Sequence, residues 1–129
     1  MSAMRIVWVF LGGGLGSVAR FVVGTVALER YGAAFPYGTL AVNLLGSALL
    51  AALVHVSLAT SAVSADLRIA LATGVLGGFT TYSAFSQETF AYLQDGAWGI
   101  GAAYVAVTLV GCLLACLVGQ GVARWLVGG

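Results

Sequence analysis

Four long apolar stretches, separated by short polar connections, constrain the fold of this chain more than any other feature of its sequence. They cover roughly residues 5–28, 38–58, 67–94 and 97–126. Each is long enough for a helix to cross the hydrocarbon core of a bilayer, which takes about 20 apolar residues. We therefore predict an all-α, multi-pass membrane protein whose four transmembrane helices form a single domain over residues 1–129.

The composition excludes several classes of protein. The chain is 61% apolar and 7% charged, whereas soluble domains carry about 25% charged residues, so it could not cover a surface that faces water. It has no Lys and its five basic residues are scattered, so no basic patch indicates nucleic acid binding. No nucleotide-binding loop or catalytic triad is present, and we predict no enzymatic activity. We interpret Cys112 and Cys116, one helical turn apart in an apolar run, as small packing residues.

Small residues recur at a spacing that brings helices together in lipid. Gly12 and Gly16 form one GxxxG pair, and Gly74 and Gly78 form another. Such pairs let helix backbones approach closely. Four short helices enclose little interior, so we also expect an oligomer. The basic residues give only a weak preference for one orientation, which fits a chain that inserts both ways and whose antiparallel copies resemble the inverted repeats of transporters.

Residues 77–88, GGFTTYSAFSQE, concentrate polarity inside an apolar stretch. The two glycines weaken a helix, and the hydroxyl groups of Thr80, Thr81 and Ser83 can bond the backbone groups that a break would free. Non-helical backbone at membrane depth is tolerated only where protein or water surrounds it. We therefore predict that the third helix is broken at this point, a feature that recurs at ion and substrate sites.

The same segment carries three aromatic residues and one acid. Phe79, Tyr82 and Phe85 recur every third residue, which would place them along one side of a helical segment. They form either a packing stripe or a set of ring edges, whose positive potential can face a small anion. For Glu88 we expect a capping or interhelical hydrogen bond rather than proton transfer.

Polar residues in the other spans leave two interpretations open. Arg20 is permanently charged and either marks an aqueous cavity that favours an anion or extends to the interface. Asn43 either bonds a neighbouring helix or lines a pore. A ladder of polar side chains at i, i+4 and i+8 of the fourth span suits a pore lining or ordinary interhelical bonding; it comprises Tyr104, Thr108 and Cys112.

Taken together, four motifs give the chain a resemblance to a known family. GGFTTYSAFSQE, the upstream GSVAR, PYGTLAVNLLGS and the AAY that opens the fourth span resemble the CrcB/Fluc fluoride channels over essentially the whole length. The resemblance implies an antiparallel, dual-topology homodimer of four-helix subunits in the cell membrane, with two fluoride pores along the dimer interface.

The resemblance also implies roles for individual residues. The fluoride pore would be lined by Asn43, Phe79, Tyr82, Ser83, Phe85, Tyr104, Thr108 and Cys112. Arg20 would make the vestibule positive, and backbone carbonyl groups of Gly77 and Thr80 from both subunits would hold a structural sodium ion. Two positions depart from the family pattern: the hydroxyl group of Tyr82 adds a donor where the family has Phe, and Cys112 is a weaker donor than a hydroxyl.

The function implied is the passive exit of cytoplasmic fluoride by electrodiffusion, which lowers its toxicity. One alternative is a small dual-topology, proton-coupled multidrug exporter. Such a transporter needs a buried carboxylate, and the only embedded acid here is Glu88. A second alternative is a non-conducting structural subunit, in which the changes at Tyr82 and Cys112 have closed the pores. The expected partners are fluoride, a second copy of the chain and lipid, with no nucleic acid.

Overall fold

The computed structural model describes residues 1–129, and all of its regular secondary structure is helical. Its elements are α1 (Ala3–Tyr31), α2 (Tyr37–Ala59), α3 (Ala65–Ile69), the π-helix η1 (Ala70–Leu76), α4 (Gly77–Phe79), α5 (Tyr82–Gln94) and α6 (Trp98–Val127). Three of them, α1, α2 and α6, are long and apolar enough to cross a membrane. Helices α1 and α2 contain the predicted spans 5–28 and 38–58, and α6 begins one residue after the start of the predicted span 97–126. The stretch 67–94 is divided among the four shorter elements.

Local signals account for where the helices begin and end. The side chain of Ser2 caps the N-terminus of α1 by accepting from the Arg5 N–H group. Gly32 ends this helix with φ at 75°, a conformation that favours glycine. Pro36 precedes α2, where a residue without an N–H group costs no helical hydrogen bond. Gly96, with φ at 71°, makes the tight connection between α5 and α6.

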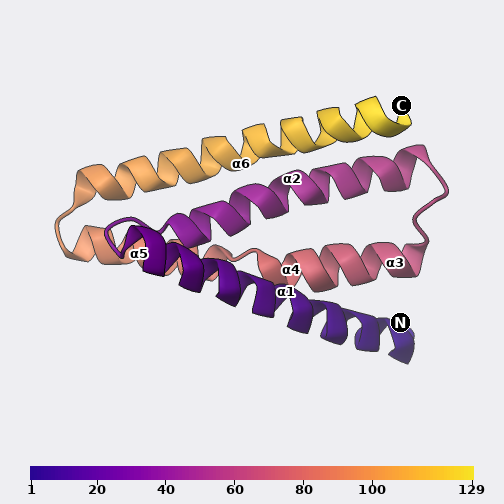
Figure 1. The fold of residues 1–129 in the computed structure, drawn as a ribbon, viewed down its shortest axis with the longest axis horizontal. Helices are drawn as coiled ribbons and strands as arrows, with labels where there is room; N and C mark the ends of the chain where they lie inside the picture. The colour runs from indigo at the N-terminus through magenta and orange to yellow at the C-terminus, as the bar shows by residue number, and fades with distance from the viewer.

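The helices run back and forth between two ends of an elongated bundle (Figure 1). Both termini and the connection from α2 to α3 lie at one end, while the connections from α1 to α2 and from α5 to α6 lie at the other. Helix α6 packs along α2, and α1 packs along η1 and α4. Between α2 and α6 the chain returns along the bundle through α3, η1, α4 and α5.

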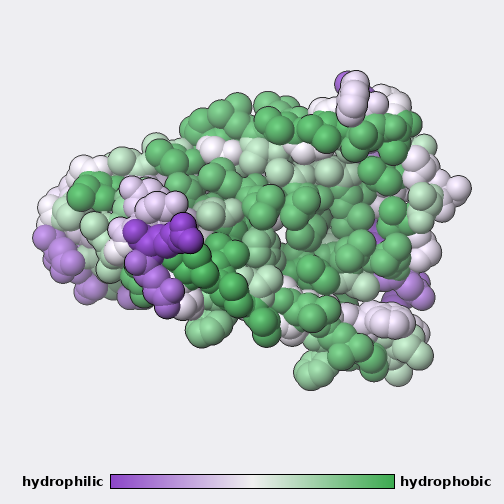
Figure 2. All heavy atoms as spheres, in the orientation of Figure 1, coloured by the Kyte–Doolittle hydropathy of each residue, from purple (hydrophilic) through white to green (hydrophobic).

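Most of the surface is apolar. Only 14 of 129 residues are buried, and the exposed side chains include many large apolar ones, such as Phe10, Leu58 and Trp125. Figure 2 shows apolar side chains over most of the visible face, with the strongly hydrophilic ones gathered towards the two ends of the bundle. Such a surface is stable when it is covered by lipid or by a second protein, and not when it faces water.

The glycine pairs bring helix backbones close together, as the sequence predicted, and Gly12 of one pair lies beside Gly74 of the other. A Cβ atom added at Gly12 would lie 2.7 Å from the Ala70 carbonyl oxygen and 3.2 Å from the Gly74 Cα atom. A Cβ atom at Gly78 would lie 2.5 Å from the Gly13 carbonyl oxygen. Neither helix could carry a larger side chain here without moving away from the other, so glycine sets the close approach of α1 to η1 and α4.

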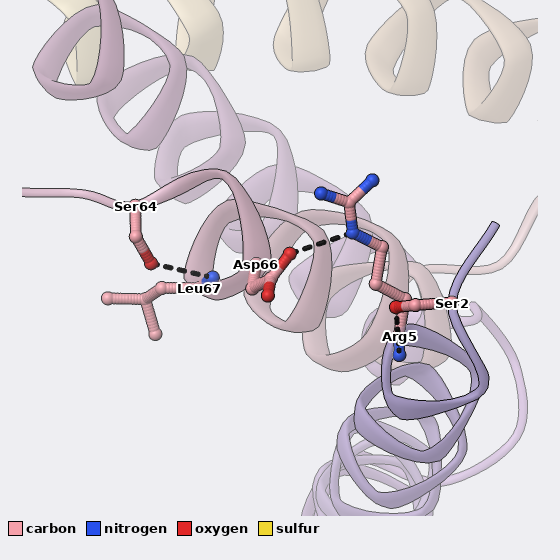
Figure 3. Close-up of polar contacts among 5 residues, drawn as sticks. All are labelled: Ser2, Arg5, Ser64, Asp66 and Leu67. Carbon is pink, nitrogen blue, oxygen red and sulfur yellow. Dashed lines mark hydrogen bonds and ion pairs between the residues drawn. The ribbon is translucent and has the colours of Figure 1, made fainter.

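Polar contacts tie the first turn of α1 to the first turn of α3 (Figure 3). The Arg5 Nε atom donates to the Asp66 carboxylate over 2.7 Å. Ser64 caps α3 by accepting from the Leu67 N–H group over 3.2 Å. Because both charged side chains are about half exposed, this ion pair contributes about 1 kcal/mol or less to stability.

Candidate ion-binding site

The polar residues meet where the backbone between α4 and α5 leaves the helix. Thr80 and Thr81 are both extended, with φ and ψ of −84° and 160° at Thr80 and of −152° and 115° at Thr81. Asn43 of α2 is nearly buried and donates from Nδ2 to the Thr81 carbonyl oxygen over 3.0 Å. The Thr81 N–H group donates in return to Asn43 Oδ1 over 2.8 Å. The amide therefore satisfies both backbone groups of Thr81 that a continuous helix would have paired.

Threonine hydroxyl groups pair further backbone groups near this segment. Thr81 Oγ1 caps α5 by accepting from the Ala84 N–H group, and Thr80 Oγ1 donates to the Leu76 carbonyl oxygen. Both bonds agree with the sequence prediction for these threonines. The prediction for Ser83 was wrong, because its hydroxyl group lies 3.3 Å from the Thr81 hydroxyl group and bonds no backbone atom. The Thr81 side chain already accepts from the freed Ala84 N–H group at the start of α5.

Several backbone carbonyl groups at this point remain unpaired, including the two that the family resemblance assigns to sodium. Neither the Gly77 nor the Thr80 carbonyl oxygen accepts a hydrogen bond from another residue of the chain. Helix carbonyl groups that a break frees are the type of ligand that coordinates sodium in membrane proteins. The donor set therefore fits the sodium site that the family resemblance implies.

Arg20 lies on the other side of the same segment. Its Nε atom donates to the Gly78 carbonyl oxygen over 3.0 Å. The side chain lines a pocket of about 490 Å³, which Thr25, Thr39 and Thr81 also line. The structure thus gives Arg20 a partner within the bundle and places its charge beside the break.

A second pocket, of about 480 Å³, lies on the face between α2, α5 and α6. Asn43, Tyr82, Phe85, Thr108 and Cys112 line it, together with Gly77, Thr80 and Thr81. Thr81 lines both pockets, whereas its partner Asn43 lines only this one. The Thr108 hydroxyl group is buried and has no hydrogen-bond partner in the chain. A buried polar group without a partner indicates a place for water, an ion or another subunit.

The aromatic residues do not form the single stripe that their spacing predicted. Phe79 is buried in α4, whereas Tyr82 is 78% exposed at the start of α5. The extended residues between these helices change the direction of the chain, so helical spacing does not hold across them. Tyr82 and Phe85 do pair, with ring centroids 5.8 Å apart. Phe85 then meets Tyr104 of α6 edge-on, with centroids 5.2 Å apart.

Glu88 accepts two interhelical hydrogen bonds, as expected. Thr39 Oγ1 donates to Glu88 Oε1 over 2.6 Å, and the Tyr104 hydroxyl group donates to Oε2 over 2.7 Å. These bonds join α2, α5 and α6 at the end of the bundle away from the termini. From the sequence Thr39 was expected at most to bond its own backbone, whereas its hydroxyl group bonds Glu88. The available signal was that an embedded carboxylate requires donors from neighbouring spans.

The structure therefore brings together most, but not all, of the predicted site residues. Phe79, Ser83 and Tyr104 do not line the pocket that holds the other five candidates for the fluoride pore. Phe79 packs beside Gly46, and Tyr104 is fully buried against Phe85. Arg20 lines the separate pocket on the opposite side of the break.

Comparison with known proteins places this arrangement in a family. The family described as CrcB-like protein, Camphor Resistance (CrcB), matches residues 7–120. A relative from Sorangium cellulosum (strain So ce56) is 49% identical over 122 residues, which cover 95% of this chain and 96% of the relative. One from Anaeromyxobacter sp. (strain K) is 49% identical over 124 residues, covering 96% and 98%. Both relatives are named fluoride-specific ion channel FluC. With its long apolar helices and a family match over nearly its whole length, this chain is a multi-pass membrane protein of the CrcB family.

Proposed function

We propose that this protein is a fluoride-selective channel through which cytoplasmic fluoride leaves the cell by passive electrodiffusion. The observation that carries the proposal is the pocket shared by Asn43, Thr108, Cys112 and two aromatic rings, in a chain whose relatives are named fluoride-specific ion channels. We assign it no enzymatic activity.

The polar groups of this pocket suit a small, strongly hydrated anion. A selective pore must replace the water around the ion with donors fixed at close range. The Thr108 hydroxyl group has no partner within the chain. Asn43 Nδ2 donates one bond to Thr81 and carries a second hydrogen that is free for an anion. Cys112 adds a weaker donor on the same face of α6.

The aromatic rings and Arg20 both supply positive potential, but from different places. The rings line the pocket of the proposed pore, whereas the charge of Arg20 lies in the separate pocket beside it. The edges of Tyr82 and Phe85 are positive, and both rings line the pocket. Because only Arg20 Nε is used by Gly78, the two other nitrogen atoms of the guanidinium group can attract anions into the vestibule. Phe79, Ser83 and Tyr104 do not line this pocket. In this proposal they belong to the pore as neighbours of the residues that do.

We further propose that residues 1–129 form one domain of four spans, with the stretch 67–94 as a discontinuous span, and that two copies pair antiparallel. The large exposed apolar surface and the open pocket support a second copy as the cover. Freed carbonyl groups of Gly77 and Thr80 would hold a structural sodium ion between the two breaks. If so, replacing sodium with choline should convert purified dimers to monomers, whereas unchanged dimers would exclude this role.

The surroundings of Glu88 distinguish the fluoride channel from the alternative, a proton-coupled multidrug exporter. A proton-coupled exporter requires a carboxylate that is free to exchange protons and cations, whereas Glu88 accepts bonds from Thr39 and Tyr104. The test is expression in a bacterium that lacks its own fluoride channel. We expect growth on fluoride to be restored, with no change in tolerance to quaternary ammonium compounds. Tolerance to those compounds without tolerance to fluoride would overturn the proposal.

A further inference from the structure

The two cysteines of the chain lie on the same pocket. Cys112 and Cys116 are four residues apart in α6, both are partly exposed, and both line the pocket of about 480 Å³. They are the only thiols in the sequence. The Cys116 thiol lies 3.6 Å from the Ser47 carbonyl oxygen of α2, on the same wall. Both thiols therefore lie where a ligand in this pocket could reach them.

Their spacing suits a shared ion better than a disulfide. Side chains four residues apart on a helix have Cβ atoms about 5–6 Å apart, whereas a disulfide requires about 3.5–4.5 Å. A soft cation with two ligands would sit between the two sulfur atoms. With metal–sulfur bonds of about 2.3 Å, the length of a zinc–thiolate bond, it would hold the two sulfur atoms well beyond the length of a disulfide bond. Such an ion bridges the gap that a disulfide cannot close without distorting α6.

A second observation indicates that the pocket accepts a ligand. Thr108, one turn before Cys112, is 6% exposed and lines the same pocket, yet its hydroxyl group has no partner in the chain. Thiolate sulfur selects soft metal ions over hard ones. The ligand that two adjacent thiols would add to this pocket is therefore a soft cation.

We propose that Cys112 and Cys116 form a binding site for a soft divalent cation of the mercury(II) type. Each thiol releases its proton to solvent, and each sulfur donates an electron pair to the ion, so one divalent cation replaces two protons. The bis-thiolate complex is neutral, which matters because a net charge is costly to place among apolar residues. A monovalent soft ion bound by two thiolates would leave one negative charge.

The functional consequence rests on the proposed fluoride channel. An ion held at Cys112 lies one helical turn from Thr108 and in the pocket that Asn43 lines. It would therefore obstruct the proposed route, and soft cations should inhibit fluoride efflux. Binding itself does not depend on conduction, so the two claims can fail separately.

Binding is tested on the purified full-length chain in detergent with mercury(II) nitrate in chloride-free buffer. We expect an ultraviolet thiolate-to-mercury absorption band that saturates at one ion per chain, with two protons released. Cys116→Ser removes one of two linked ligands and should weaken binding at least about 100-fold. Ala115→Ser adds a hydroxyl group to the same turn outside the pocket and should bind like the wild type. Equal affinity in Cys116→Ser, or one ion per two chains, would overturn the site.

Inhibition is tested in liposomes, with each variant compared with its own rate before mercury is added. Efflux from wild-type liposomes should stop, recover with excess dithiothreitol, and need at least about 100-fold more mercury in Cys116→Ser. Efflux that continues at saturating mercury would refute the obstruction. If the wild type binds one ion per chain but never conducts fluoride, the channel proposal fails and the metal site is supported.

Discussion

Gly16→Ala tests the packing that positions the break. A Cβ atom at Gly16 would lie closest to the Val75 carbonyl oxygen, and also 2.8 Å from the Phe79 nitrogen and 2.9 Å from the Val75 carbonyl carbon. Ordinary contacts begin at 3.4 Å. All three atoms belong to the backbone, so no side chain can turn aside, and α1 must move away from η1 and α4.

The expected cost follows from this geometry. Overpacking of a well-packed site costs about 1–3 kcal/mol, and the upper end applies because only backbone atoms are involved. The same movement would carry Arg20, one turn along α1, away from the Gly78 carbonyl oxygen. We therefore expect the free energy of unfolding to fall by about 2–3 kcal/mol and fluoride efflux to fall with it.

Equilibrium unfolding in mixed detergent micelles measures the first effect, and efflux from liposomes measures the second. The matched control is Gly14→Ala, because a Cβ atom at Gly14 meets nothing within 4 Å. This control should leave stability unchanged or raise it by up to about 1 kcal/mol, the helix propensity gained from alanine. If Gly16→Ala were as stable as Gly14→Ala, the close approach of α1 to η1 and α4 would be refuted.

Three further substitutions separate structural from functional roles. Asn43→Leu leaves both backbone groups of Thr81 unpaired, at about 1–3 kcal/mol each, so unfolding should become easier by about 2–6 kcal/mol; unchanged stability would contradict the role of this amide. Thr108→Val removes a hydroxyl group without a partner, so stability should hold or rise while efflux slows; a loss of stability would show that the hydroxyl group is structural. Arg5→Gln breaks the exposed pair with Asp66 and should lower the unfolding free energy by less than about 1 kcal/mol; a larger loss would reveal a stronger tie between α1 and α3.

Hydrophobicity and small-residue spacing predicted the arrangement of the long helices well. The bounds of α1, α2 and α6 follow the apolar stretches within a few residues, because each span must match the thickness of the bilayer. The glycine pairs also allow close helix approach as expected, because a missing side chain lets two helix backbones come together.

Residues near the break were harder to predict because their partners depend on how distant segments pack. Helical spacing failed for Phe79 and Tyr82, which the extended threonines place in different environments. The bond from Arg20 to the Gly78 carbonyl oxygen could not be foreseen, because it pairs a side chain with a backbone atom that only the irregular chain path exposes. The π-helix η1 has no recognisable sequence signal either.

Fluoride efflux from liposomes that contain the purified wild-type chain, followed with a fluoride electrode, tests the central claim most directly. Chloride in matched liposomes is the control for selectivity. The account predicts rapid release of fluoride and no release of chloride above that of protein-free liposomes. Retention of fluoride by liposomes that contain well-folded dimers, or release of both anions at similar rates, would contradict it.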